Sequence, residues 1–260
     1  MKKLSLKSRL SAGRMMIGSW ITLASGDTAE IMAQSGFDWL AVDMEHSVIT
    51  LGKAQELIRI IEANNVVPLV RVGENNPVII KRVMDAGAYG VIVPMVNTEE
   101  DARKAVVSVK YPPVGQRGVG LARAQGYGVQ FEHYKEWVNK ESVVIVQIEH
   151  IKAVANLEKI LTVKGVDGFI VGPYDLSASL GIPGQLNHAS VKAACRKILE
   201  VSEKFKKPAG FHVIPPNYSA LLKKVKEGYQ FLGFSLDALF LRHHCSQQMD
   251  KVKSHLKKKR

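Results

Sequence analysis

The chain has 260 residues, of which 46% are hydrophobic, and a formal net charge of +12. This is an ordinary composition for a globular protein, and the apolar runs stop well short of the roughly 18 residues that a membrane span needs. Because the N-terminus has no apolar signal region and Cys195 and Cys245 form no paired motif, we expect a cytoplasmic protein without a disulfide framework or a zinc site.

The excess positive charge lies at the two ends of the chain. Residues 1–10 carry four basic residues and residues 251–260 carry six, with no acid in either segment. Without these ten charges the rest of the chain carries only +2. We therefore expect solvated basic tails on a nearly neutral body, with no nucleic-acid or membrane partner. A non-enzymatic protein that binds polyanions through its tails is the alternative, and deletion of both tails would distinguish the two.

Eight apolar segments alternate with amphipathic segments along the chain. The predicted strands are 14–20, 37–44, 66–72, 90–95, 143–149, 166–172, 209–214 and 231–236. Helical spacing of apolar residues is clearest at 51–65, 76–88, 98–110 and 188–205. Buried strands that alternate with helices predict a single α/β domain over residues 1–260, a (β/α)8 TIM barrel. A doubly wound open sheet is the competing fold, but no GxGxxG motif follows the first strand.

One connection, residues 111–142, is much longer than the others and contains five glycines. Long connections in compact domains are usually functional. We expect this one on the face of the barrel that carries the active site. Its Arg117, Arg123 and His133 are then candidates for contacting an anionic or polyhydroxy substrate.

Polar side chains follow four of the predicted strands at the point where each strand ends. They are Asp43, Glu45 and His46 after the second strand, Arg71 after the third, Gln147 and Glu149 after the fifth, and Asp175 after the sixth. In TIM barrels the C-terminal ends of the strands form the active site, so this set predicts a catalytic centre.

Two of these acids suit a metal ion. Gln147 and Glu149 are two residues apart and point to the same side of their strand. Glu149 and Asp175 come from neighbouring strands, and two carboxylates with open positions for water and substrate suit Mg²⁺ or Mn²⁺. A buried salt bridge between either acid and Arg71 is the structural alternative.

The motifs together carry a family resemblance. GFDWLAVDMEH, VPLVRV, MDAGAYGVIVPMVNTEEDARKAV, YPPVGQRGVG, VQIE and GVDGFIVGPYDLSASLG resemble the HpcH/HpaI family of class II pyruvate aldolases, in order from about Gly18 to Asp237. This family includes 4-hydroxy-2-oxoheptanedioate and 2-dehydro-3-deoxyglucarate aldolases. The resemblance implies a phosphoenolpyruvate/pyruvate-type barrel that cleaves or forms a 4-hydroxy-2-keto acid, to or from pyruvate and an aldehyde, through a pyruvate enolate.

The resemblance also implies roles for individual residues. Glu149 and Asp175 would hold a divalent metal (Mg²⁺, Mn²⁺ or Co²⁺), and Arg71 would stabilise the enolate. Pyruvate would be bound by the Gln147 side chain and by the backbone around Tyr174 and Asp175. His46 would accept the proton, Asp85 would raise its basicity and Asp43 would orient it.

The sequence departs from the family pattern at two positions. His150 stands where a small Ser or Thr is common, and strand alternation should turn it away from Glu149. Tyr174 stands where a smaller residue is usual and could alter which aldehyde fits.

The family further implies a homo-oligomer, a hexamer, in which the helix near 238–255 is exchanged and the 111–142 segment crosses a subunit boundary. Another 2-keto acid or phosphoenolpyruvate lyase on the same barrel is the enzymatic alternative. A Schiff-base aldolase is not indicated, because no lysine stands at the C-terminal end of a strand.

Overall fold

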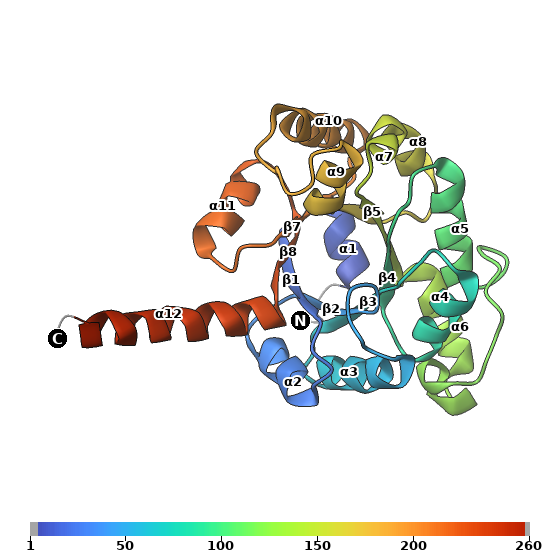
Figure 1. Ribbon diagram of the computed structural model, residues 1–260. Helices are drawn as coiled ribbons and strands as arrows, with labels where there is room; N and C mark the ends of the chain where they lie inside the picture. The colour runs from blue at the N-terminus through green and yellow to red at the C-terminus, as the bar shows by residue number, and fades with distance from the viewer. Residues whose placement is uncertain (1–4, 258–260) are drawn as a thin grey trace.

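The computed structural model describes residues 5–257, in which eight parallel strands close into a barrel in the order β1 to β8 (Figure 1). The strands are β1 (Met16–Ile21), β2 (Trp39–Asp43), β3 (Val67–Arg71), β4 (Gly90–Val93), β5 (Val143–Ile148), β6 (Gly168–Val171), β7 (Ala209–Val213) and β8 (Phe231–Leu236). All eight predicted strands and the predicted TIM barrel are confirmed. Five of the ten basic residues in the predicted tails, Lys2, Lys3, Lys258, Lys259 and Arg260, lie outside the described residues.

Helices surround the barrel and follow the strands in alternation (Figure 1). They are α1 (Leu6–Ser11), α2 (Gly26–Gln34), α3 (Leu51–Ala63), α4 (Pro77–Asp85), α5 (Glu99–Val109), η1 (Arg123–Gly128), α6 (Phe131–Lys140), α7 (Ile151–Ala155), α8 (Leu157–Thr162), α9 (Pro173–Ser179), α10 (Ala189–Phe205), α11 (Tyr218–Lys226) and α12 (Asp237–Lys257). Side-chain oxygens of Ser25, Thr50 and Thr98 accept backbone N–H groups at the start of α2, α3 and α5. These caps satisfy donors that have no partner inside the helix and so fix where each helix begins.

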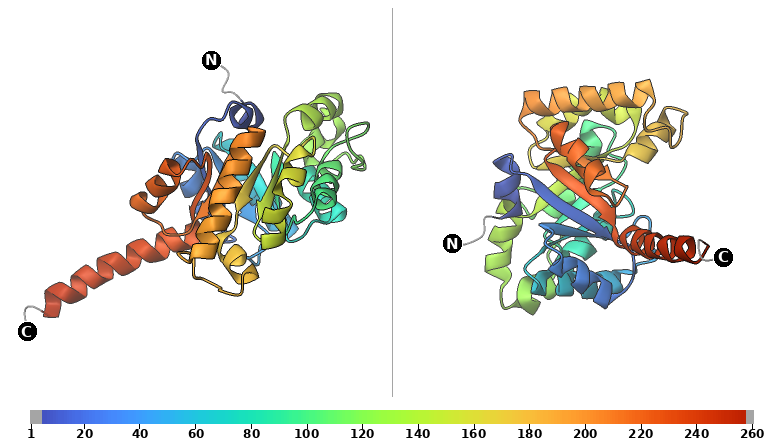
Figure 2. Two further views of the ribbon diagram at one scale, coloured as in Figure 1. Left: turned by 90° about the horizontal axis from the view of Figure 1, so that it is seen from above. Right: turned by 90° about the vertical axis from the view of Figure 1, so that its left-hand side faces the viewer.

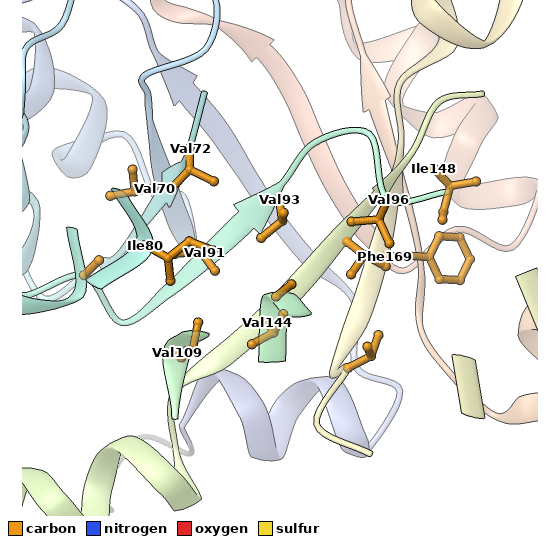
Figure 3. Close-up of a cluster of buried hydrophobic side chains, with 14 of the residues drawn as sticks. Val70, Val72, Ile80, Val91, Val93, Val96, Val109, Val144, Ile148 and Phe169 are labelled. Atoms are coloured by element: carbon orange, nitrogen blue, oxygen red, sulfur yellow. The ribbon is translucent and has the colours of Figure 1, made fainter. Parts of the chain in front are cut away.

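Alternate residues of each strand divide the core into two layers. The outer cluster packs the sheet against the helices, and its Val70, Val91, Val144 and Phe169 are drawn in Figure 3. The inner cluster fills the barrel with side chains that include Trp39, which stacks on Phe231 with ring centroids 4.5 Å apart. The interior is therefore a packed core, and space for a ligand is left only at the ends of the strands.

Helix α1 closes the end of the barrel at which the strands begin (Figure 2). Leu6 and Leu10 belong to the inner cluster, and Leu10 is only 1% exposed. Lys7 pairs with an acid of the barrel, Asp167, at 3.1 Å. The prediction of a solvated N-terminal tail is therefore wrong for the described part of the segment, because its two leucines, one helical turn apart, form a buried face.

The 111–142 segment is not an open loop on the active-site face. It contains η1 and α6, and it joins a helix, α5, to a strand, β5. Such a connection lies at the N-terminal ends of the strands, whereas the site forms at the opposite ends. The segment is tied there by Arg117, which pairs with Asp85 at the end of α4 at 2.6 Å, and by Arg123, which pairs with Glu62 of α3. The prediction that residues 111–142 lie on the active-site face is therefore wrong for a single chain.

Helix α12 leaves the barrel and extends into solvent (Figure 2). Its first residue, Asp237, is buried, whereas every described residue from 241 onward is exposed. The exposed side chains include four large apolar ones, Leu241, Met249, Val252 and Leu256. Within residues 5–257, no helix is both long and apolar enough to cross a membrane. In the same residues Cys195 and Cys245 are free thiols.

Candidate active site

A cavity of about 300 Å³ opens at the C-terminal ends of the strands. Six predicted site residues line it: Asp43, His46, Arg71, Gln147, Tyr174 and Asp175. A seventh, Glu149, contacts this lining because Gln147 donates a hydrogen bond to its carboxylate. The strand ends therefore bring together side chains that lie up to 132 positions apart in the sequence. Among the described residues no lysine lines this cavity.

Arg71 is held rigidly by Asp43 from the neighbouring strand. Nε of Arg71 lies 2.9 Å from Oδ1 of Asp43, and an Nη lies 2.6 Å from Oδ2, so the two planar groups meet in a bidentate pair. The register pairs Asp43 with Arg71 at the ends of β2 and β3. Burial alone would raise the pKa of Asp43, but the hydrogen bonds and the charge of Arg71 outweigh it and hold the pKa below its ordinary value.

Two further neighbours fix the guanidinium of Arg71. The Trp20 ring lies beneath it, with 4.4 Å from Cζ to the ring centroid, and Glu45 lies 3.3 Å from Nε. Burial raises the pKa of Glu45 to about 7, with the charge of Glu149 adding to the rise and Arg71 opposing it. Among the described residues Arg71 pairs with Asp43 and Glu45. The structural alternative, a salt bridge from Arg71 to Glu149 or Asp175, is therefore wrong.

Glu149 is a buried carboxylate without a cationic partner among the described residues. Its Oε1 accepts the backbone N–H of Met95 at 2.7 Å. Met95 has a φ of 53°, in the left-handed region that non-glycine residues rarely occupy. Burial raises the pKa of Glu149, and the nearby charge of Asp175 adds to the rise. The charge of Arg71 opposes this rise, but no described residue forms an ion pair with Glu149, so a bound cation would stabilise the anion.

These residues fit a divalent cation. Asp175 stands in the first turn of α9 and lines the cavity, and it lies near enough to Glu149 for its charge to act on that carboxyl. Oε1 of Gln147 is buried and has no hydrogen-bond partner. Residues 5–257 contain no group of three acids, histidines or cysteines that could hold a metal. The chain thus offers two hard carboxylate ligands, and water or substrate would complete the coordination.

His46 lies at the mouth of the cavity, with its side chain 62% exposed. Its backbone N–H donates to Oδ1 of Asp43 at 3.2 Å, so Asp43 holds the main chain of His46 and not its ring. The nearest acid to the imidazole is Glu45, at 3.9 Å. Asp85, the predicted partner of His46, instead accepts hydrogen bonds from Arg117 at 2.6 Å and Gln125 at 3.2 Å. One chain therefore does not bring Asp85 to His46.

The two residues that depart from the family pattern, His150 and Tyr174, lie in different surroundings. His150 caps α7, and its Nδ1 accepts the backbone N–H of Lys152 at 3.0 Å. This bond uses the nitrogen's lone pair, which leaves His150 as a capping residue. Tyr174 is 51% exposed and lines the mouth of the cavity.

The structure adds Trp20 and His212 to the predicted set, and it places Glu45 of the predicted set beside Arg71. Trp20 lies in the first predicted strand. His212 of β7 also lines the cavity. For Trp20 and His212 the only signal in the sequence is strand alternation, which shows which side of a strand faces inward but not how close the side chain lies to the site.

Comparison with known proteins gives the same assignment from three directions. The family model described as HpcH/HpaI aldolase/citrate lyase matches residues 16–242. The hydroxypyruvate/pyruvate aldolase of Sagittula stellata is 42% identical over 240 residues, which cover 91% of this chain and 92% of that protein. The 2-keto-3-deoxy-L-rhamnonate aldolase of Escherichia coli K12 is 35% identical over 250 residues, covering 95% and 92%.

A solved structure shares both fold and sequence. The crystal structure of an HpcH/HpaI aldolase/citrate lyase family protein from Burkholderia cenocepacia J2315 superposes with a TM-score of 0.91 at 33% identity, covering 95% of this chain and 98% of that one. Identity of 35–42% to aldolases over most of the chain supports a carbon–carbon lyase. With its family model matched from β1 into α12, the chain belongs to the HpcH/HpaI aldolase/citrate lyase family.

Proposed function

We propose that this protein is a class II aldolase that cleaves or forms a 4-hydroxy-2-keto acid through the enolate of a pyruvate-type donor. The observation that carries the proposal is that two kinds of charged group stand at one cavity, which Arg71 and Asp175 line and which Glu149 adjoins through Gln147. Glu149 and Asp175 are carboxylates without a cationic partner among the described residues, and Arg71 is a fixed positive charge held by Asp43. This arrangement suits a reaction in which negative charge develops on an oxygen between a metal and a guanidinium.

Enzymes of this family generally depend on a divalent metal. Bound by Glu149 and Asp175, such a cation would supply a Lewis acid that polarises the keto group of the substrate. Its identity is proposed from the ligands: two carboxylates favour Mg²⁺, Mn²⁺ or Co²⁺ over metals that prefer sulfur. Arg71 offers fixed donors to the oxygen on which the charge develops. Because Asp43 and Trp20 already hold the guanidinium, little reorganisation accompanies the reaction.

Gln147 and the start of α9 bind the donor. Oε1 of Gln147 has no partner in the protein, and the amide Nε2 donates to Glu149, so this side chain links the donor pocket to the metal ligand. Backbone groups around Tyr174 and Asp175 at the first turn of α9 would bind the carboxylate of the donor, where a helix N-terminus favours negative charge.

We assign proton transfer to His46, which stands at the open mouth of the cavity where the aldehyde part of the substrate would lie. In cleavage it removes the proton of the 4-hydroxyl, and in synthesis it returns it. Asp85 contacts Arg117 of the 111–142 segment within its own chain. If that segment crosses a subunit boundary as the family resemblance implies, Asp85 reaches His46 from a neighbouring subunit.

Hydrogen exchange at the donor tests this proposal without knowledge of the aldehyde. With the divalent metal present and no aldehyde, the protein should exchange the methyl protons of pyruvate with solvent deuterium, because enolisation is half of the aldol reaction. The methyl signal in proton NMR should fade, and excess chelator should prevent this.

Glu149→Gln should abolish the exchange, since it keeps the shape of the side chain but removes its charge. Glu158→Gln is the matched control, because Glu158 is an exposed acid that pairs with Lys204 on the outside of the barrel. Persistent exchange in Glu149→Gln, or none in the metal-loaded wild type that still binds pyruvate, would refute the enolate mechanism.

A further inference from the structure

His212 lies beside Trp20 at the cavity, and the proposed reaction assigns it no task. Its neighbours in β7, Phe211 and Val213, belong to the outer cluster, so alternation turns His212 toward the interior of the barrel. Its ring lies 5.1 Å from the ring of Trp20, centroid to centroid, and Trp20 lies 4.4 Å from Cζ of Arg71. These three side chains, from β7, β1 and β3, all line the cavity. They form a row of contacts that ends at the guanidinium.

The indole of Trp20 is held by packing and not by a hydrogen bond. Its Nε1 is buried and has no hydrogen-bond partner among the described residues. The side chain is 1% exposed, and its aromatic neighbours include His212 and Trp39, whose ring lies nearly perpendicular to it at 6.1 Å. Because no polar contact fixes the indole, its orientation depends on the side chains that pack against it. Removal of the ring of His212 would therefore loosen the surface on which Arg71 rests.

His212 is itself anchored to the neighbouring strand. Its Nε2 lies 3.3 Å from the backbone carbonyl oxygen of Ser235, and because a carbonyl oxygen only accepts hydrogen bonds, Nε2 carries the proton. Ser235 has a φ of 51°, and the register of β1 and β8 shifts here, so β8 contains a bulge. Two hydroxyl groups hold this bulge: Ser19 donates to the carbonyl of Phe234 at 2.8 Å, and Ser235 donates to that of Ile214 at 2.9 Å. The orientation of the imidazole is thus set by a fixed backbone group.

The ring of His212 is neutral beside the guanidinium. Burial, and then the positive charge of Arg71, lowers the pKa of His212 to about 3. The hydrogen bond to Ser235 and the charge of Asp43 oppose this fall without reversing it. An uncharged ring can pack on Trp20 without repelling Arg71, whereas a cationic side chain at this position would place a second positive charge near the first.

We infer that His212 is a positioning residue for Arg71: its ring, anchored to Ser235, holds Trp20 in the orientation that supports the guanidinium. This inference rests on the proposed aldolase function, in which Arg71 donates to the oxygen where negative charge develops. Such a donor is effective only when it is aligned before the reaction, so a shifted indole would slow the chemical step. Binding of pyruvate in the ground state would change little, because the charge that Arg71 stabilises develops only during the reaction.

The exchange of pyruvate methyl protons, measured with Mg²⁺ and without aldehyde, separates kcat from KM. His212→Ala should lower kcat about tenfold and change KM by less than about threefold, as expected when a fixed donor loses its alignment. His212→Phe should recover most of this loss, because it restores a flat ring against Trp20. A rise in KM at constant kcat would show that His212 contacts the substrate directly and would overturn the inference, as would equal losses in the two variants.

A double-mutant cycle tests whether His212 acts through Arg71. In the Arg71→Lys background, His212→Ala should lower kcat by less than about threefold further, because the group that it positions has already been replaced. In the Tyr174→Phe background, a matched change elsewhere in the cavity lining, His212→Ala should keep its loss of about tenfold. A loss of the same size in both backgrounds would show that His212 acts independently of Arg71 and would overturn the inference.

A second variant serves should His212→Ala fail to fold, which thermal unfolding would show. His212→Asn keeps a polar side chain but loses the ring, and the same losses are expected in the same cycle. A wild type that exchanges no pyruvate with Mg²⁺, Mn²⁺ or Co²⁺ refutes the aldolase function, and the assignment of His212 falls with it. Normal exchange in the wild type together with additive losses in the cycle refutes only the role of His212.

Discussion

Arg71 owes its position to three neighbours, and this makes it a sensitive test of the mechanism. Asp43 holds two of its nitrogens, Glu45 lies near Nε, and Trp20 packs against the flat face of the guanidinium. A lysine cannot reproduce a bidentate, stacked geometry.

We expect Arg71→Lys to lower kcat by a factor on the order of 10², as loss of one fixed donor to a developing oxyanion typically does. Steady-state kinetics with saturating metal measures this. Arg82→Lys serves as the control, since Arg82 lies on the surface helix α4. A fall in kcat of less than about threefold in Arg71→Lys would show that Arg71 has a structural role only.

The buried pair of Asp43 and Arg71 should also leave a signature in the pH dependence of stability. Arg71 holds the pKa of Asp43 below its ordinary value of 3.8 despite burial. Stability from a carboxylate with a lowered pKa is fully present above the unfolded pKa and is lost as the pH falls through the folded one.

Asp43→Asn should therefore lower the free energy of unfolding by about 1–3 kcal/mol at neutral pH, because Arg71 loses its main partner. The difference from wild type should stay constant down to about pH 5 and shrink below about pH 4. Urea titrations of both proteins at several pH values would show this. A difference that grows on acidification contradicts the account.

The sequence predicts most of the polar residues that surround the cavity, for a reason that can be stated. Asp43, Arg71, Gln147 and Asp175 stand at strand ends, and a parallel barrel places all strand ends on one face. Asp85 stands at the end of a helix, and its place relative to the cavity depends on how whole segments pack. Strand ends can be read from the order of apolar runs, whereas packing of this kind cannot.

Strands and long helices were predicted to within a few residues because their apolar periods are clear. Two segments differ from the prediction, for different reasons. The basic residues of 1–10 concealed the pair Leu6 and Leu10, which is one turn of an amphipathic helix. In 111–142 the glycines suggested a loop, although FEHYKEWVNK has helical spacing and forms α6. The position of residues 111–142 on the barrel follows from the order of helices and strands. A connection that runs from a helix to the next strand lies on the face opposite the site.

Helix α1 should contribute measurably to the stability of the barrel. Leu10 is 1% exposed and packs in the inner cluster, so Leu10→Ala should cost about 2–4 kcal/mol through lost burial and the cavity left behind. Ser11→Ala, an exposed change in the same helix, should cost less than about 0.5 kcal/mol. Urea unfolding measures both. Equal stabilities of the two variants would show that the segment behaves as a solvated tail and does not stabilise the barrel.

The basic residues of the N-terminal segment are a weaker candidate for a polyanion site than the sequence suggests. Lys7 pairs with Asp167 and Arg9 pairs with Asp38, so both described basic residues of the first segment are neutralised by the barrel. Deletion of residues 1–10 would remove the buried cap as well as the charge. Deletion of 251–260 alone is therefore the informative test of the tails, and we expect it to leave the exchange of pyruvate unchanged.

Helix α12 has a length that the rest of this chain does not explain. Isolated helices are marginal in water and usually owe their stability to packing, yet the described residues from 241 onward are all exposed. This supports the proposal that α12 packs on another copy of the chain, as the family resemblance implies.

We expect light scattering to give a mass several times the 28.7 kDa of one chain, six times for a hexamer. A chain that ends at residue 240 should shift to a smaller assembly. A monomeric wild type, or a truncated chain with unchanged multiplicity, would contradict the role of α12.

The cap that α1 and the inner cluster form over one end of the barrel leaves the cavity a single entrance. The two reactants must therefore enter and leave in a fixed order. On the proposed function the donor would bind deepest, against Arg71 and Gln147, while the aldehyde would occupy the outer part beside His46 and Tyr174. In cleavage the aldehyde must depart first and the keto acid last; in synthesis the donor must enter first. Pyruvate should accordingly inhibit cleavage competitively against the aldol, and the aldehyde should inhibit it noncompetitively, so that product-inhibition kinetics report how the far end of the barrel is closed.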